Sequence, residues 1–258
     1  MKHNFIDQYS DLDSLIHRLD PRVKFISILA FIIVVVSTPI RNWLSMVTYF
    51  CLIVACLVLS RLPPVYVLKR SLAIFPFVLV IAVFIPFFKP GEVAGSYNLW
   101  LGRISITYDG LFILANIASK AWLCILALIL LSGTTKFTFL LKGLRQLRVP
   151  EVILMIISFM YRYIFLVVDE AMRMRQGRDS RNFGGTRWHQ LRTIGHMVGT
   201  LFIRSYERGE RIYAAMVARG FDGEVRSLNE LRFAPADACF SFVFGFVLIY
   251  SFVTFGLV

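Results

Sequence analysis

The sequence lacks the short motifs that identify most nucleotide-binding and catalytic chains. It has no Gly-x-x-x-x-Gly-Lys-Ser/Thr phosphate loop, so we expect the chain not to bind ATP itself. It has no Gly-x-Ser-x-Gly or His-x-x-Glu-His pattern that would give Ser119 or Ser132 a catalytic context. No group of His, Cys and carboxylate residues has the spacing of a zinc or transition-metal site. The sequence therefore predicts no enzyme, no cofactor and no metal site.

Cysteine and acidic residues are both scarce. The four cysteines form no Cys-x-x-Cys pair and lie in or beside apolar segments, so we expect them to pack as small hydrophobic side chains. They are Cys51, Cys56, Cys124 and Cys239. The 16 acidic residues face 28 basic ones, which gives a formal charge of +12. The first 20 residues hold four aspartates and no apolar run, and we expect no cleavable signal peptide there.

What the chain has in abundance is apolar side chains. Hydrophobic residues make up 57% of it, 24 of them phenylalanine, and the mean hydropathy is +0.68. Soluble domains are about half apolar. A basic protein that binds nucleic acid would not also carry several uncharged stretches of membrane length. The composition therefore predicts a protein embedded in a lipid bilayer, with no nucleic-acid partner.

Five apolar runs approach the roughly 20 residues that a spanning helix needs. They predict an all-α integral membrane protein with about five transmembrane helices and long cytoplasmic helices, in a single domain over 1–258. Pro76 and Pro86 are expected to kink or break the third span. Residues 89–109, which end in an alternating pattern, are expected to form an external loop with a small hairpin. The predicted spans are about 24–40, 43–60, 71–88, 110–135 and 236–257.

The basic residues predict the orientation. With the N-terminus in the cytoplasm and five alternating spans, 24 of the 28 basic residues fall on the cytoplasmic side. Arg41, Lys89 and Arg103 fall outside, and Lys120 lies within the membrane. The C-terminus is then outside. Lys120 is either a functional residue or a structural one whose amine reaches an interface, and we favour the second interpretation.

The basic region of about 136–232 is too long for a loop. Pro150 and Glu151 begin a predicted helix of about 30 residues, which reaches the charged run ending at Arg181. A sixth span within 152–168 would place the basic tail outside, and we reject it. A second helix is predicted over Gly195–Arg219, with Glu207 and Arg211 spaced for an ion pair. Its apolar stripe consists of Phe202, Tyr206, Tyr213 and Met216.

Each of these two helices ends in a similar arginine signature. The first is Ser180-Arg181-Asn182-Phe183-Gly184-Gly185, and the second, 38 residues later, is Ala218-Arg219-Gly220-Phe221-Asp222-Gly223. Asn and Gly tolerate the left-handed conformation that closes a helix, and a cation suits the last turn. Two ordinary helix caps are one interpretation. The other is that two arginines on rigid ends enter acidic grooves of a partner, since guanidinium pairs bidentately with carboxylates.

The two signatures resemble the paired Ala-Arg-Gly motifs of the transmembrane T component of energy-coupling factor (ECF) importers. Two further stretches extend the resemblance. Ser14-Leu15-Ile16-His17-Arg18-Leu19-Asp20-Pro21-Arg22-Val23-Lys24 is similar to that family's entry into its first span, and Met174-Arg175-Gln176-Gly177-Arg178-Asp179-Ser180-Arg181 is similar to its first coupling helix. The first signature departs from the family form in having Ser180 for Ala and Asn182 for Gly.

The resemblance implies a role without catalysis in a prokaryotic plasma membrane. The T component joins two ATP-binding cassette ATPases to a substrate-binding membrane subunit, and its signature arginines enter grooves of the ATPases. By position these would be Arg181 and Arg219. Apolar faces of 137–170 and 197–217 would contact the substrate-binding subunit. The neighbouring residues assigned to the same site are Ser180, Asn182, Ala218 and Gly220, with Arg178, Phe183 and Phe221 in support.

The cargo is open at this point. The chain looks most like the T components of cobalt or nickel importers, whereas vitamin importers use related ones. A metal cargo would have to be bound by another subunit, because the histidines are isolated. We expect His3, His189 and His196 to be solvated and His17 to form a cap or a pair near the membrane. A stand-alone carrier or channel is the remaining alternative, although no inverted repeat or paired intramembrane charge supports it.

Overall fold

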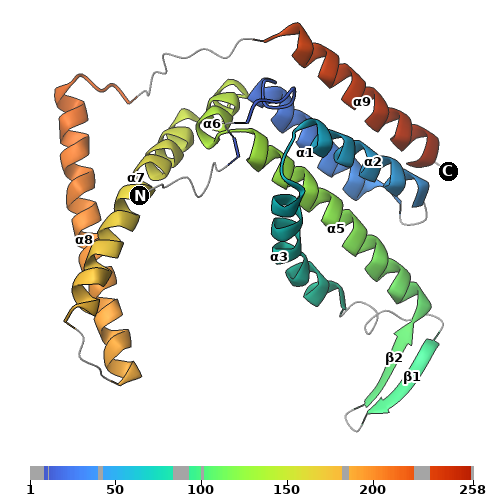
Figure 1. Ribbon diagram of the computed structural model, residues 1–258, viewed down its shortest axis with the longest axis horizontal. Helices are drawn as coiled ribbons and strands as arrows, with labels where there is room; N and C mark the ends of the chain where they lie inside the picture. The colour runs from blue at the N-terminus through green and yellow to red at the C-terminus, as the bar shows by residue number, and fades with distance from the viewer. Residues whose placement is uncertain are drawn as a thin grey trace. The chain divides into compact units, whose positions relative to one another are not determined.

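The computed structural model describes residues 9–10, 12–39, 43–83, 93–99, 102–181, 186–223 and 233–256. The chain packs as two compact units. The first is a helical bundle made of Asn4–Gly143 and Leu231–Val258, and the second is a helix pair within Leu144–Glu230. Apart from one two-stranded sheet, every regular element of the described residues is a helix (Figure 1), which confirms the predicted all-α class.

The helical bundle contains the helices predicted to span the membrane. α5 contacts α1, α2 and α3, while α9 packs on α1 and α2 (Figure 1). Four of the predicted spans begin within about three residues of the observed helices, because charges and prolines mark those ends in the sequence. The helices are α1 (Pro21–Ser37), α2 (Trp43–Leu59), α3 (Pro64–Val83), α5 (Tyr108–Thr134), the short α6 (Phe137–Gln146) and α9 (Pro235–Gly256).

The helix that contains the third predicted span starts seven residues before the span, and its first turns include the charged residues Lys69 and Arg70. α3 begins at Pro64, because proline is favoured in the first helical turn, where its missing N–H would have no intrahelical partner. Pro76 lies inside α3. Residues 84–88, including Pro86, lie outside the described residues.

The predicted hairpin between the third and fourth spans is present. β1 (Val93–Leu99) pairs with β2 (Gly102–Thr107) in antiparallel register, and Leu99 lies opposite Gly102 at the turn. The register shifts between Val93 and Gly95, as it does at a β-bulge.

The interior of the bundle is aromatic and aliphatic. Phe31 and Val35 of α1 and Ile53 of α2 are fully buried, and the Phe31 ring meets Tyr49 edge-on with centroids 6.1 Å apart. Other large apolar side chains point outward, for example Phe242 of α9, which is 77% exposed. A helix with apolar residues on both its inner and outer faces suits a bilayer, where lipid tails cover the outer face.

Helix length and composition agree with a membrane location. Three described segments are long and apolar enough to cross a membrane: Gly110–Thr134, Glu151–Asp179 and Pro235–Val253, with Leu44–Leu59 as a shorter apolar helix. Glu151–Asp179 belongs to the helix pair rather than to the bundle. Its first half is apolar, and its second half is charged.

Three helix ends of the bundle meet at a buried cluster of charges, here called the charge clasp: Asp20, Lys24, Thr134 and Asp237. The Lys24 amine donates to the carbonyl of Thr134 at the end of α5 and to that of His17, each at 3.1 Å. Asp237, in the first turn of α9, accepts the backbone N–H of Asp20 at 2.7 Å. Asp20, Lys24 and Asp237 are each at most 5% exposed. Sequence reasoning did not single out Asp237.

The clasp follows from helix electrostatics. The carboxylate of Asp20 accepts the N–H of Arg22 at 2.9 Å and so caps α1, while Asp237 accepts the N–H of Ala234 at 2.8 Å before α9. Anions are favourable at these two helix N-termini, and a cation is favourable at the C-terminus of α5. Lys24 supplies the cation, and its charge interacts with both carboxylates.

Two further polar groups are satisfied at helix ends. The Lys120 amine donates to the carbonyls of Thr38 at 2.7 Å and Val36 at 3.0 Å, where α1 has run out of intrahelical donors. These hydrogen bonds support a structural role for Lys120. The amine caps the end of α1 instead of reaching a membrane interface. The His17 ring lies 2.7 Å from the Ser14 hydroxyl and 3.2 Å from the Tyr9 carbonyl, and burial lowers its pKa. The expected pairing of His17 is therefore confirmed.

The clasp predicts that Lys24→Met destabilises the bundle strongly. Removing the amine takes a buried cation away from Asp237 and removes the donor to the Thr134 carbonyl, whereas Asp20 keeps Arg22 at 3.7 Å. We expect a cost of about 3 kcal/mol of unfolding free energy. Thermal unfolding of the purified chain in mild detergent measures the loss. Lys69→Met is the matched control, because Lys69 is exposed on α3. Equal unfolding temperatures for the two variants would contradict the role of the clasp.

Candidate functional site

Both arginine signatures belong to the helix pair. It consists of α7 (Glu151–Asp179) and α8 (Arg187–Ala218). The first half of α7 lines a groove together with the second half of α8, so the helices run antiparallel. The length predicted for the first helix is confirmed, whereas α8 begins eight residues before the predicted Gly195. An ion pair between Arg145 and Glu151, with N–O distances of 2.9 and 2.7 Å, fixes the start of α7.

The end of α8 is a complete Schellman motif. Arg219 is the C-cap, and Gly220 follows in the left-handed conformation with φ of +81°. The N–H of Gly220 donates to the Val217 carbonyl at 2.9 Å, and that of Phe221 donates to Met216 at 3.0 Å, which are the two hydrogen bonds of the motif. No atom lies within 4 Å of where a Cβ on Gly220 would stand. Glycine is therefore favoured here by backbone conformation rather than by space.

α7 also ends within its arginine signature, but its C-cap is the residue before the signature arginine, whereas the C-cap of α8 is the signature arginine itself. Ser180 is the C-cap in a helical conformation, its N–H donating to Gln176 at 3.0 Å. The N–H of Arg181 donates to the Arg178 carbonyl at 3.0 Å, so the backbone still turns at the signature arginine. Asn182 and Phe183 lie outside the described residues. Both helices therefore end at their signatures, as predicted, with Arg181 and Arg219 exposed.

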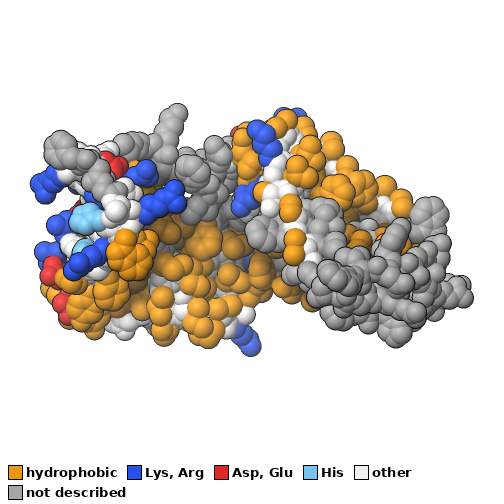
Figure 2. All heavy atoms as spheres, turned by 90° about the horizontal axis from the view of Figure 1, so that it is seen from below, with side chains coloured by type: hydrophobic (Ala, Val, Ile, Leu, Met, Phe, Trp, Pro, Cys, Tyr) orange, Lys and Arg blue, Asp and Glu red, His pale blue; other side chains and the backbone are white. Residues whose placement is uncertain are grey.

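A basic cavity of about 660 Å³ opens beside the end of α7. Arg181 lines it, as does Arg178, whose guanidinium donates to Asp179 at 2.6 and 3.0 Å. His189 of α8 lies on the opposite wall. Figure 2 shows Lys, Arg and His side chains gathered at this end of the helix pair, beside a broad apolar surface. The cavity can receive an acidic group, since the cations around it outnumber the anions.

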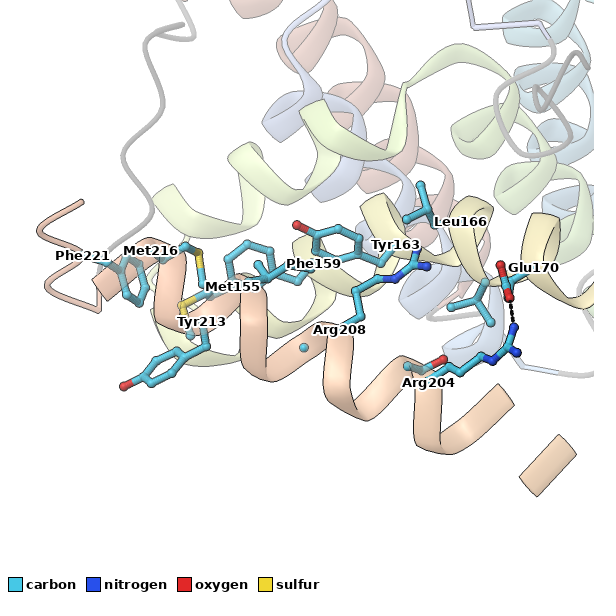
Figure 3. A pocket seen from close by; sticks show the side chains of 14 residues that line it. Met155, Phe159, Tyr163, Leu166, Glu170, Arg204, Arg208, Tyr213, Met216 and Phe221 are labelled. Atoms are coloured by element: carbon cyan, nitrogen blue, oxygen red, sulfur yellow. Dashed lines mark hydrogen bonds and ion pairs between the residues drawn. The ribbon is translucent and has the colours of Figure 1, made fainter. Parts of the chain in front are cut away.

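An apolar groove of about 370 Å³ lies between the first half of α7 and the second half of α8 (Figure 3). Phe159 and Tyr163 form the wall on α7, and Tyr213 and Met216 form the wall on α8. Phe221, the residue after the Schellman glycine, closes one end, so the second arginine signature is part of the groove. The apolar character of the lining suits an apolar segment of a partner.

α8 also carries an uncovered apolar ridge. None of its described residues is buried, and Phe202, Tyr206 and Tyr213 of the predicted stripe are 60–72% exposed. The predicted ion pair of Glu207 with Arg211 is wrong, as neither residue forms one among the described residues. Both residues are exposed, where water competes for the charges and an i,i+4 pair contributes only a few tenths of a kcal/mol. Arg204 of the same helix forms an ion pair with Glu170 of α7.

Comparison with known proteins gives a consistent picture. Residues 13–231 match the sequence profile of a protein family described as "CbiQ: Cobalt transport protein". A protein of Listeria innocua named energy-coupling factor transporter transmembrane protein EcfT is 29% identical over 93% of each chain. A protein of the same name from Ruminiclostridium cellulolyticum is 28% identical over 90% of each. A putative fused cobalt transport protein CbiMQ of Methanocorpusculum labreanum is 28% identical over 78% of this chain and 34% of its own length.

The Schellman motif predicts opposite effects for two glycine substitutions on α8. Gly220→Ala places a side chain in the left-handed region and weakens the helix end by about 1–2 kcal/mol. Gly209→Ala, at an open position inside the helix, stabilises it by about 1 kcal/mol. Hydrogen exchange of the α8 amides measures both, with roughly tenfold faster exchange at Phe221 expected for Gly220→Ala. Slower exchange in that variant would contradict the motif.

Proposed function

Because the chain belongs to the CbiQ family of cobalt transport proteins, we propose that it is the coupling subunit of an ECF-type importer. In this proposal two ATP-binding cassette ATPases bind the arginine ends of the helix pair. A separate membrane subunit binds the cargo. The movement of the ATPases on nucleotide binding then passes through α7 and α8 to that subunit. The chain itself catalyses nothing.

One observation carries the proposal. Arg181 and Arg219 are exposed at the ends of two long helices of one unit, and each side chain has no ion-pair partner among the described residues. An arginine whose backbone is already fixed loses only side-chain entropy when it binds a carboxylate groove, and its planar guanidinium is preorganised for two parallel hydrogen bonds. Two such ends match two ATPase subunits. Ser180, Ala218 and Gly220 set the helix endings, and Arg178 and Phe221 line the adjoining hollows.

The apolar surface of the helix pair supports a second contact. Phe202, Tyr206 and Tyr213 are exposed along α8, and the apolar groove lies between α7 and α8. An exposed apolar face of this size is typical of a protein or membrane contact. We propose that the substrate-binding membrane subunit covers this apolar face and that the membrane surface lies next to it.

The proposed topology follows from charge. The N-terminus and the basic region of about 136–232 lie in the cytoplasm, five helices span the bilayer and the C-terminus lies outside. In this arrangement α7 enters the membrane surface with its apolar half and extends about 45 Å in total.

The proposed cargo is Co²⁺, with Ni²⁺ as the neighbouring choice and a vitamin as the alternative. Support comes from the name of the matching family and from the fused relative described as a cobalt transport protein. The transmembrane relatives named EcfT leave the vitamin alternative open. A stand-alone carrier or channel is the second alternative.

We expect Arg181→Glu and Arg219→Glu to weaken ATPase binding, with the double variant worst. Each change replaces a guanidinium by a carboxylate that repels an acidic groove, so co-purification of the ATPases should fall by about tenfold or more per site. Pull-down from mild detergent measures this, with Arg192→Glu, exposed on α8, as the matched control. Full assembly and full uptake in both single variants would rule out the coupling role.

Cargo identity is tested with radioactive ⁵⁷Co²⁺ and ⁶³Ni²⁺ in cells that express the complete complex. We expect ATP-dependent Co²⁺ uptake that disappears when the substrate-binding subunit is omitted, because that subunit would hold the metal. Uptake of a vitamin and of neither metal would favour the alternative. Uptake by this chain alone would favour a stand-alone carrier.

A further inference from the structure

An ion pair joins α7 and α8 where their two hollows meet. The guanidinium of Arg204 donates through Nη1 to Oε1 of Glu170, as the dashed line in Figure 3 shows. Both residues line the apolar groove and also the basic cavity, so the pair stands at the boundary between them. Of the residues that line either hollow, Glu170 alone is acidic.

The surrounding packing is thin. Leu154 is the buried residue of α7, and α8 has none among its described residues. Helices in a close-packed interior are held in register by interdigitated side chains. Here hollows of about 370 and 660 Å³ border the ion pair instead. Little apolar packing therefore opposes a change in the angle or the register of the two helices.

A carboxylate–guanidinium contact restrains a tilt of one helix against the other less than it restrains a slide along it. Oε1 and Nη1 remain in contact when one helix tilts about the pair, because the long arginine side chain follows. A slide by one helical turn, about 5.4 Å, breaks the contact. The side chain of Glu170 is 19% exposed and that of Arg204 is 55% exposed, so water screens the pair mainly from the arginine side.

We infer that the ion pair of Glu170 with Arg204 is a pivot that fixes the register of α7 against α8 while their crossing angle changes. Arg181 follows Glu170 by eleven residues, and Arg219 follows Arg204 by fifteen. The two arginine ends therefore lie about 16 and 22 Å along their helices from the pivot. The pivot sets the spacing of the two ends. Its consequence for transport rests on the proposed function, but the register itself does not.

Spin-label distances test the register on the full chain in detergent, without any partner. Labels are placed at Gln176 and Arg192, both exposed, in a variant whose four cysteines are replaced. We expect Glu170→Gln to broaden the distance distribution, because the helices then slide. Arg204→Lys keeps the charge and should keep the distribution narrow. The charge exchange Glu170→Arg with Arg204→Glu should narrow it again.

Two matched variants separate the pivot from a general effect of charge. Glu210→Gln and Arg211→Gln remove exposed charges of α8 that form no ion pair among the described residues. A distribution for Glu170→Gln that equals those of Glu210→Gln and Arg211→Gln overturns the pivot. So does a charge exchange that leaves the distribution as broad as the single variant does.

The assembled complex gives an independent readout of the consequence for transport. We expect Glu170→Gln to keep co-purification of the ATPases but to raise the ATP hydrolysed per cargo transported by about fivefold, and the charge exchange to restore it. If the wild-type chain binds no ATPase while the spin labels respond as expected, the proposed function fails and the pivot stands. If assembly is normal and the labels do not respond, the pivot fails alone.

Discussion

The bundle depends on one buried lysine. Lys24 lies between the N-termini of α1 and α9 and the C-terminus of α5, and it compensates two carboxylates that the helix N-termini attract. Burying a charge is costly unless it is compensated and hydrogen-bonded. Asp20, Lys24 and Asp237 each form hydrogen bonds with backbone groups, and the lysine carries the charge opposite to that of the two carboxylates. Because apolar packing between membrane helices differs little from packing against lipid tails, polar contacts of this kind have a large share in fixing which helices are neighbours.

The bundle and the helix pair are built on different principles. In the bundle, Phe31, Val35 and Ile53 belong to one continuous interior, and buried polar groups lie both at helix ends and within helices, as Ser27 and Ser71 do. The helix pair has hollows where an interior would be, and its apolar side chains point outward. A loosely packed helix pair changes its arrangement at a lower cost than a closely packed bundle does.

The positions of most helices and the end of α8 could be predicted from the sequence, because residues close together in the chain determine them. Spans are marked by charges and prolines, and the second signature closes α8 through Gly220, a residue whose lack of a Cβ predicts its conformation. The first turns of α3 were not predicted as helix, because Pro64 begins the helix seven residues before the uncharged run that marks the span. Asp237 was missed because its partner, Asp20, is more than 200 residues away, and no periodicity encodes such a contact. The pairing of Arg204 with Glu170 was likewise missed, because it joins two helices at a separation of 34 residues.

Phe221 contributes to two features of the helix pair, one through its backbone and one through its side chain. Its backbone N–H completes the end of α8 two residues after Arg219, and its side chain closes the apolar groove. A ligand in the groove and a ligand on Arg219 therefore both act on this short segment. If each prefers the same position of Phe221, binding of one raises the affinity for the other by an equal factor, as thermodynamic reciprocity demands. A single phenylalanine at a helix end thus links the apolar groove to the arginine two residues before it.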